Sequence, residues 1–248
     1  MKIVVCVSHV PDTASKINIG SDGKSLDTTG LTFVLNPYDE FAIEEALKTK
    51  EKVGGEVILL SVGDDSFKES LRKGLAMGAD SAILLKSSSY LDSLSVSKIL
   101  ANEISSLGSE LVFLGKQSVD YDNSVIGQML SELLNFSSVS VAVNFNIDGA
   151  KILAEREIEG GKEVVELTLP AVVTTQKGLN EPRYPSLKGI MASKKKVIEE
   201  KQAKTFDNYS EFIALQRPAL KSAGKIVGTD VTAVGELVRL LREEAKVI

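Results

Sequence analysis

Cysteine and histidine are nearly absent from this sequence, which contains one residue of each kind among 248. A single cysteine excludes an internal disulfide and a metal site built from cysteines. Cys6 stands between Val5 and Val7, so we expect a buried thiol on a β-strand of a protein from a reducing compartment. His9 belongs to no motif, and a solvated or capping side chain is a simpler expectation than contact with a ligand.

Excess positive charge and long hydrophobic runs are also missing. The chain has 29 Lys and Arg against 34 Asp and Glu, a net charge of -5, which argues against a protein that coats nucleic acid. The first apolar run, "IVVCV", is too short for a signal-peptide core or a membrane span, and no Arg-rich presequence precedes it. We therefore expect a cytoplasmic protein without direct membrane insertion and without a nucleic-acid partner.

Signatures of catalysis are missing as well. The sequence has no GxGxxG turn after its first strand, no GxxxxGK[ST] phosphate loop, and no Ser-Gly-Gly loop of the adenylating type. No metal cluster or nucleophile triad can be assembled from it. We therefore expect a protein without a catalytic site of its own.

The pattern that is present alternates short apolar runs with longer amphipathic segments, as in parallel strands joined by crossover helices. The firmest helix prediction begins with Asn36 as N-cap and Pro37 at the first helical position, and ends at Gly54. An open, mostly parallel sheet with helices on both faces is the expected α/β core. Its predicted strands are 3–7, 56–62, 81–85 and 110–115, and its further helices are 66–77, 92–107 and 123–135.

The pattern changes near residue 138. Four strand-like runs follow one another at 138–147, 150–158, 162–169 and 171–175, with Asp148-Gly149 and Gly160-Gly161 as hairpin turns, which predicts an antiparallel extension. A short helix, a polar connection and an amphipathic helix at 230–245 come last. We expect an α/β domain over residues 1–195 and an extended C-terminal tail over 196–248 that packs on another surface or chain.

Two loops are placed to bind a ligand. The loop at 115–134 and the turn at 36–39 both follow strands, so both are expected at the carboxyl ends of the sheet, where open α/β folds bind ligands. A helix beginning near Asp122 or Asn123, either one acting as N-cap, offers unpaired amides to a nucleotide phosphate. The alternative is that Asp120, Asp122 and Asn123 merely cap the helix.

A third loop, "NEPRYPSLKGIMASKKK" at 180–196, carries an apolar face on a short predicted helix. Leu187, Ile190 and Met191 lie at i, i+3 and i+4, so this face either packs inward or anchors a partner. Three lysines at 194–196 are most simply a solvated surface.

The stretch "AEREIEGGKEVVELTLPAVVTT" at 154–175 resembles the signature of the electron transfer flavoprotein beta subunit. Its Ala154, Arg156, Glu159, Gly160, Gly161, Glu163, Val165, Pro170, Val172, Val173 and Thr174 match that pattern. The blocks "VSHVPD", "NPYDEFAIEEAL", "AMGAD" and "GKQSVDYDNSVIGQM" are similar too and occur in the family's order. The resemblance covers nearly the whole chain and implies an adenine nucleotide alpha hydrolase-like, Rossmann-type fold.

The resemblance also implies a function in fatty acid oxidation. Such a beta subunit forms a heterodimer with an alpha subunit that holds most of one FAD, while the beta subunit holds a structural AMP. The pair takes electrons from acyl-CoA dehydrogenases and other flavin dehydrogenases and passes them to a membrane quinone reductase. The AMP contacts carried over by motif are Cys6, Asn36, Pro37, Tyr38, Asp39, Val62, Asp120, Asp122, Asn123, Ser124, Val125, Gly127, Gln128, Met129, Leu130 and Ser131.

The loop at 180–196 resembles the family's recognition loop, in which Leu187 would dock into a pocket on the dehydrogenase, with Tyr184, Ile190 and Met191 beside it. The loops "DYDNSVIGQM" and "LNEPRYPSLKGIMASKKK" are similar to the AMP-holding, non-bifurcating branch. Three alternatives remain. They are an electron-bifurcating beta subunit with a second FAD, a free-standing adenine-nucleotide-binding sensor, and a nucleotide-hydrolysing or adenylating enzyme.

Overall fold

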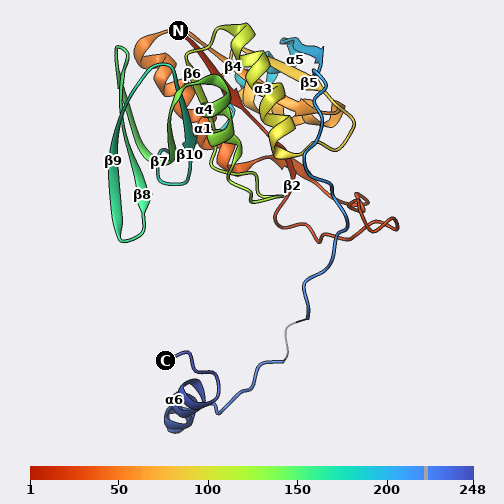
Figure 1. Cartoon of the computed structure of the whole chain (residues 1–248), viewed down its shortest axis with the longest axis vertical. Helices are drawn as coiled ribbons and strands as arrows, with labels where there is room; N and C mark the ends of the chain where they lie inside the picture. The colour runs from red at the N-terminus through yellow and green to blue at the C-terminus, as the bar shows by residue number, and fades with distance from the viewer. Residues whose placement is uncertain (221–222) are drawn as a thin grey trace. The chain divides into compact units, whose positions relative to one another are not determined.

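The computed structural model describes residues 1–220 and 223–248. Among these residues the main feature is a nine-stranded sheet, whose strands lie in the order β11-β5-β4-β1-β6-β10-β7-β8-β9 (Figure 1). The strands of this sheet are β1 (Lys2–Cys6), β4 (Glu56–Gly63), β5 (Ser81–Lys86), β6 (Leu111–Gly115), β7 (Ser137–Asp148), β8 (Lys151–Ile158), β9 (Gly161–Thr168), β10 (Ala171–Thr175) and β11 (Ile198–Gln202). A separate pair is formed by β2 (His9–Pro11) and β3 (Phe33–Leu35).

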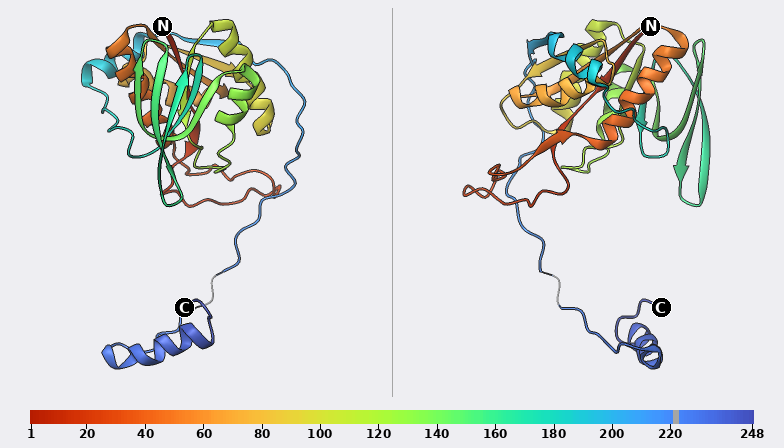
Figure 2. Two further views of the ribbon diagram at one scale, coloured as in Figure 1. Left: turned by 60° about the vertical axis from the view of Figure 1, so that its left-hand side comes forward. Right: turned by 180° about the vertical axis from the view of Figure 1, so that it is seen from behind.

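Helices cover both faces of the parallel core, as the sequence predicts (Figures 1 and 2). On one face, α1 (Pro37–Val53) and α2 (Lys68–Met77) pack on alternate side chains of β1 and β4. On the other face, α3 (Ser93–Leu107) and α4 (Ile126–Leu134) cover the remaining side chains. Because both faces are covered, β1, β4, β5 and β6 are buried along nearly their whole length and read as continuous apolar runs.

The antiparallel extension is confirmed for β7, β8 and β9. They are joined by two-residue turns at Gly149-Ala150 and Glu159-Gly160, each displaced by one residue from the predicted Asp-Gly and Gly-Gly positions. The β8–β9 hairpin stands at the edge of the sheet (Figure 1). The inclusion of residues 171–175 in that extension is wrong. β10 runs parallel to both β6 and β7 and is buried throughout, so it belongs to the core.

Helix boundaries follow the predicted signals with two differences. α1 has Asn36 at its N-cap, Pro37 in its first turn and Gly54 at its C-cap, as expected. α2 begins at Lys68, because a short 3₁₀ turn, η1 (Asp65–Phe67), precedes it. α4 begins at Ile126 with Val125 at the N-cap, so neither Asp122 nor Asn123 caps this helix.

The chain after residue 180 divides into two parts. α5 (Leu187–Lys195) packs on α2, and β11, which lies beyond residue 196, pairs in parallel with β5 at the edge of the sheet. Two compact units are present, Met1–Ile213 and Ala214–Ile248. The second unit contains η2 (Val231–Ala233) and α6 (Val234–Glu243), which confirms the predicted helix at 230–245 with shorter bounds. No helix among the described residues is long and apolar enough to cross a lipid bilayer.

Candidate functional site

A cavity of about 220 Å³ lies at the carboxyl ends of β1, β4 and β6. β1 is followed in the sheet by β4 and β5 on one side and by β6 on the other, so the connections change direction beside β1. In open α/β sheets the crevice at such a change of direction is where ligands bind. The expected position of the site is therefore the position of the cavity.

Asp39, in the first turn of α1, ties two of these strand ends together. Its Oδ2 accepts a hydrogen bond from the Ser8 amide at 2.7 Å, and its Oδ1 accepts one from the Gly115 amide at 2.9 Å. Burial raises the pKa of Asp39 to about 7, although these amides and the Asn36 side chain oppose that rise. Gly115 is required here, since a Cβ at this position would lie 2.5 Å from Asp39 Oδ1 and 2.6 Å from Tyr38 Cβ.

Asn36 is fully buried and fixes the loop that follows β6. Its Nδ2 donates to the Gln117 carbonyl at 2.9 Å, and its Oδ1 accepts from the Val119 amide at 3.3 Å. The side chain therefore makes no cap on α1, although the residue stands at the N-cap position. Asn36 correctly marks the start of α1, but its side chain bonds to the loop after β6 and not to the amides of the helix.

The loop at 116–125 is shaped by its own polar side chains. Ser124 donates to Gln117 Oε1 at 2.7 Å, the Gln117 amide group donates to Asp122, and Asn123 donates to Ser93 of α3 at 3.3 Å. Asp122 and Ser124 adopt left-handed conformations with φ of 52° and 53°. The loop then enters α4, whose first turn has no side-chain cap in the part of the chain that the structure describes.

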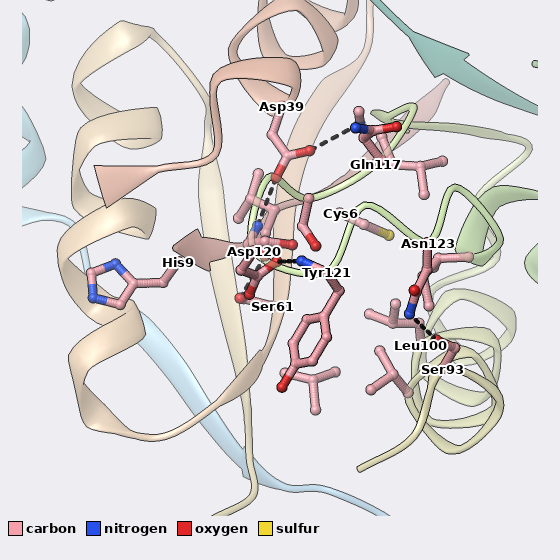
Figure 3. Close-up of a pocket in the computed structure, with 18 of the residues that line it drawn as sticks. Cys6, His9, Asp39, Ser61, Ser93, Leu100, Gln117, Asp120, Tyr121 and Asn123 are labelled. Carbon is pink, nitrogen blue, oxygen red and sulfur yellow. Dashed lines mark hydrogen bonds between the residues drawn. The ribbon is translucent and has the colours of Figure 1, made fainter. Parts of the chain in front are cut away.

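Seven of the residues expected at a nucleotide line this cavity, namely Cys6, Asp39, Val62, Asp120, Asn123, Ser124 and Val125. Figure 3 shows Cys6, Asp39, Tyr121 and Asn123 gathered around the same hollow. The other expected residues, Asn36, Pro37, Tyr38, Asp122, Gly127, Gln128, Met129, Leu130 and Ser131, are not among its lining. Gly127 and Leu130 pack toward the sheet, against Thr174 and in the core. Contact of these residues with a nucleotide stays a prediction.

Sequence reasoning missed an entire wall of the cavity. This wall is formed by two residues of the loop after β5, Tyr90 and Leu91, and by three residues of α3, Ser93, Val96 and Leu100. The lining also includes Ser8, Ser61, Gln117, Ser118 and Tyr121. The rule that placed the other loops at the carboxyl ends of strands applies equally to residues 87–92 after β5. No motif in that segment drew attention to it.

The expectation for His9 is wrong, because the side chain is buried and not solvated. Its Nδ1 lies 2.8 Å from Ser70 Oγ, and its ring stacks on Phe33 with centroids 5.2 Å apart. Burial lowers its pKa despite the opposing charges of Glu69 and Asp64. His9 is nevertheless among the residues that line the cavity, on the side of α2 (Figure 3).

The chemistry of the cavity is that of a binding site. Cys6 is buried as predicted, and burial, followed by the charge of Asp39, raises the pKa of its thiol, which stays protonated near neutral pH. Among the described residues, no group of three or more His, Cys, Asp or Glu side chains is arranged to hold a metal ion. The polar lining consists of hydroxyls, carboxamides, the His9 imidazole, the carboxyl groups of Asp39 and Asp120, and the Lys116 ammonium, and such groups bind and orient a polar ligand.

The predicted partner-recognition residues lie apart from the cavity, on and before α5. Tyr184 is 96% exposed, Leu187 84%, Met191 70% and Ile190 41%. Leu187 and Met191 therefore do not pack inward, whereas Ile190 is partly covered. Of the three lysines, Lys194 and Lys195 are exposed, whereas Lys196 donates to the Ala79 carbonyl.

Comparison with known proteins gives a consistent result. The model of the electron transfer flavoprotein domain matches residues 24–205. The chain is 40% identical to "Electron transfer flavoprotein subunit beta" of Bradyrhizobium diazoefficiens and 39% identical to that of Bacillus subtilis, over the full length of both chains in each case. It is 36% identical to the mitochondrial beta subunit of Arabidopsis thaliana, again over all of both chains. This chain therefore belongs to the electron transfer flavoprotein beta-subunit family.

Proposed function

We propose that this chain holds one AMP as a structural group in the cavity beside β1 and pairs with an alpha subunit that carries most of one FAD. The observation that supports the nucleotide part is the position of the cavity, at the point where the sheet connections change direction. The chain would act as an electron-carrier subunit without chemistry of its own.

The lining of the cavity fits a mononucleotide. Its apolar side chains suit the faces of an adenine ring, and they are Leu60, Val62, Val96, Leu100 and Leu114. Its hydroxyl and carboxamide side chains suit a ribose and a phosphate, and they are Ser8, Ser93, Gln117, Asn123 and Ser124.

The start of α4 is the part of the site best suited to a phosphate. The amides of its first turn have no side-chain acceptor among the described residues, and a helix N-terminus attracts an anion. The neighbouring acids are engaged with protein donors, since Asp122 accepts from Gln117 and Asp120 accepts from the Tyr121 amide. These hydrogen bonds offset part of the repulsion that two carboxylates would exert on a phosphate.

The apolar face of α5 is the proposed docking site for a dehydrogenase. Leu187, Met191 and Tyr184 expose most of their surface, and a cluster of exposed apolar side chains is typical of an interaction site. We propose that acyl-CoA dehydrogenases and other flavin dehydrogenases bind here and transfer electrons to the FAD of the alpha subunit. A membrane quinone reductase would then accept the electrons.

The C-terminal tail is the proposed contact with the alpha subunit. Within the second unit, α6 buries Leu240 but leaves Val234, Leu237 and Val238 more than a third exposed. An amphipathic helix with an apolar stripe of this kind is stabilised by a partner surface. The alpha subunit is the partner that the family of this chain provides.

The nucleotide content of the heterodimer tests this proposal. The chain is coexpressed with the alpha subunit of its own organism, the complex is purified and denatured, and FAD and AMP are quantified by chromatography with mass detection. One FAD and one AMP per heterodimer are expected. Two FAD without AMP would assign the chain to the bifurcating branch, and a homodimer that exchanges ATP or AMP would identify a free-standing sensor.

A further inference from the structure

The linker before α5 is fastened to α1 by two side chains, Asn180 and Arg183. Asn180 Nδ2 donates to the Phe41 carbonyl at 3.0 Å and to Glu45 Oε2 at 2.9 Å, and Arg183 makes the larger set of contacts. Arg183 donates from its backbone amide and from Nε to Glu44 Oε2, at 3.0 and 2.8 Å, and from Nη2 to Glu44 Oε1 at 2.9 Å. Its Nη1 also donates to Glu51 Oε1 at 2.6 Å, one and a half to two turns further along α1. The Glu44 side chain is 7% exposed and the Arg183 side chain 36%, so the carboxylate of this bidentate pair is buried while the guanidinium is partly in contact with water.

A second fastening holds the other end of α5. Arg72 of α2 donates to the carbonyls of Ser193 and Lys196, the latter at 2.6 Å. Between these two ends, Gly189 lies against α2 so closely that a Cβ would come within 2.4 Å of the Ala76 carbonyl oxygen. The inner side of α5 is thus fixed by polar contacts at both ends and by backbone packing in the middle.

The outer side of α5 contributes almost nothing to the fold of this chain. Leu187 and Met191 are 84% and 70% exposed, and α5 has nine residues. A helix this short is marginal in water on its own, so its tertiary contacts decide whether it forms and which way it faces. The polar contacts therefore hold in place an apolar surface from which this chain gains no stability.

We propose that Arg183 is a positioning residue for docking, which presents the apolar face of α5 in one orientation before a flavin dehydrogenase arrives. The inference rests on the proposed docking of a dehydrogenase at Leu187. A flexible loop would lose conformational entropy on binding, whereas a loop that is already fixed loses little, so the clamp strengthens binding without touching the partner. Lysine cannot replace Arg183 fully, because a point charge does not make the bidentate pair with Glu44.

Steady-state electron transfer to the purified heterodimer, with an acyl-CoA dehydrogenase reduced by its substrate as the probe, tests the inference. Arg183→Gln is expected to raise KM for the heterodimer roughly five- to twentyfold, with kcat within about twofold of the parent. Arg183→Lys should give a KM between that of the parent and that of Arg183→Gln. Because Arg183→Gln leaves Glu44 buried without a partner, the double variant Arg183→Gln/Glu44→Gln removes that charge and should show the same raised KM in a stable protein.

Hydrogen exchange in the free heterodimer gives the second readout. The amides of 187–195 should exchange faster in Arg183→Gln and in the double variant, whereas Lys73→Gln, which breaks an ion pair to Glu40 on the same helix α1, should change neither exchange nor KM. A raised KM with unchanged exchange would overturn the inference, since Arg183 would then contact the partner directly. Unchanged KM in both Arg183 variants would overturn it as well.

Leu187→Ala separates this inference from the proposal on which it rests. A higher KM in Leu187→Ala with parental KM in the Arg183 variants would leave docking at α5 intact and overturn the role of Arg183. Parental KM in Leu187→Ala would overturn docking at α5 and the role of Arg183 together.

Discussion

Replacement of Gly115 by alanine probes the geometry at the centre of the proposed nucleotide site. A Cβ at this position would lie 2.5 Å from Asp39 Oδ1, 2.6 Å from Tyr38 Cβ and 2.8 Å from the Tyr38 carbonyl carbon. Ordinary van der Waals contact begins near 3.4 Å, so β6 and the first turn of α1 must separate. That separation lengthens the hydrogen bond from the Gly115 amide to Asp39, which measures 2.9 Å in the parent.

Two contributions set the size of the effect. Overpacking of a close-packed region costs about 1–3 kcal/mol. Complete loss of the hydrogen bond to Asp39 adds about 0.5–3 kcal/mol, with the upper half of that range applying when the carboxyl is ionised. Partial relaxation places the total on the order of 3 kcal/mol, which corresponds to a fall of roughly 6–12 °C in melting temperature for a chain of this size.

The assay compares the heterodimer carrying Gly115→Ala with one carrying Gly161→Ala. No atom lies within 4 Å of a Cβ at Gly161, and its φ is not in the left-handed region, so this control should be close to neutral. Thermal unfolding is followed by circular dichroism at one scan rate, and retained AMP is measured by chromatography. Equal melting temperatures for the two variants, or full nucleotide retention by Gly115→Ala, would refute the reasoning.

Three further predictions concern the tail, the core and the loop. Burial opposes ionisation of Asp92, but the backbone amides of Ser95, Tyr209 and Ser210 donate to its carboxylate and lower its pKa to about 2. The ionised carboxylate therefore stabilises the docking of the tail by an amount on the order of 2 kcal/mol. This stabilisation is present above about pH 4 and is lost as the pH falls through 2. Proteolysis within 206–212 should therefore increase over that window, and Asp92→Asn should increase it at neutral pH. Phe113→Ala, at a fully buried ring, should destabilise the chain by about 3–5 kcal/mol in urea unfolding, and an effect below 1 kcal/mol would contradict the core assignment. Asn36→Ala removes two hydrogen bonds to the loop after β6, and the AMP to FAD ratio of the purified heterodimer should fall.

Much of the α/β core could be predicted from local patterns. β1, β4, β5 and β6 are apolar on both faces because helices cover both, and that composition is visible in the sequence. Proline in the first turn and glycine after the last turn fix the ends of α1 through their own backbone preferences. These features depend on residues that are close together in the chain, so the sequence alone is sufficient to predict them.

The sequence predicts where the candidate site lies, but only some of the residues that line it. The carboxyl-end rule brought Asp39 and the loop at 116–125 to the same place, where the structure has a cavity. The wall formed by Tyr90 and α3 was missed, because the residues that follow β5 carry no motif. His9 was misjudged because its burial depends on Phe33 and Ser70, which arrive from distant parts of the chain.

By itself, the sequence determined the family, the strand and helix periods of the core, and the presence of an apolar face on α5. Tertiary structure alone decided that β10 is a parallel strand between β6 and β7, that Asp39 joins β1 to β6, and that Arg183 is clamped to α1. The physical reason is that periodicity and turn residues report the local backbone and the burial of each face. Strand partners and buried polar pairs depend on which distant segments meet, and that is settled when the whole chain packs.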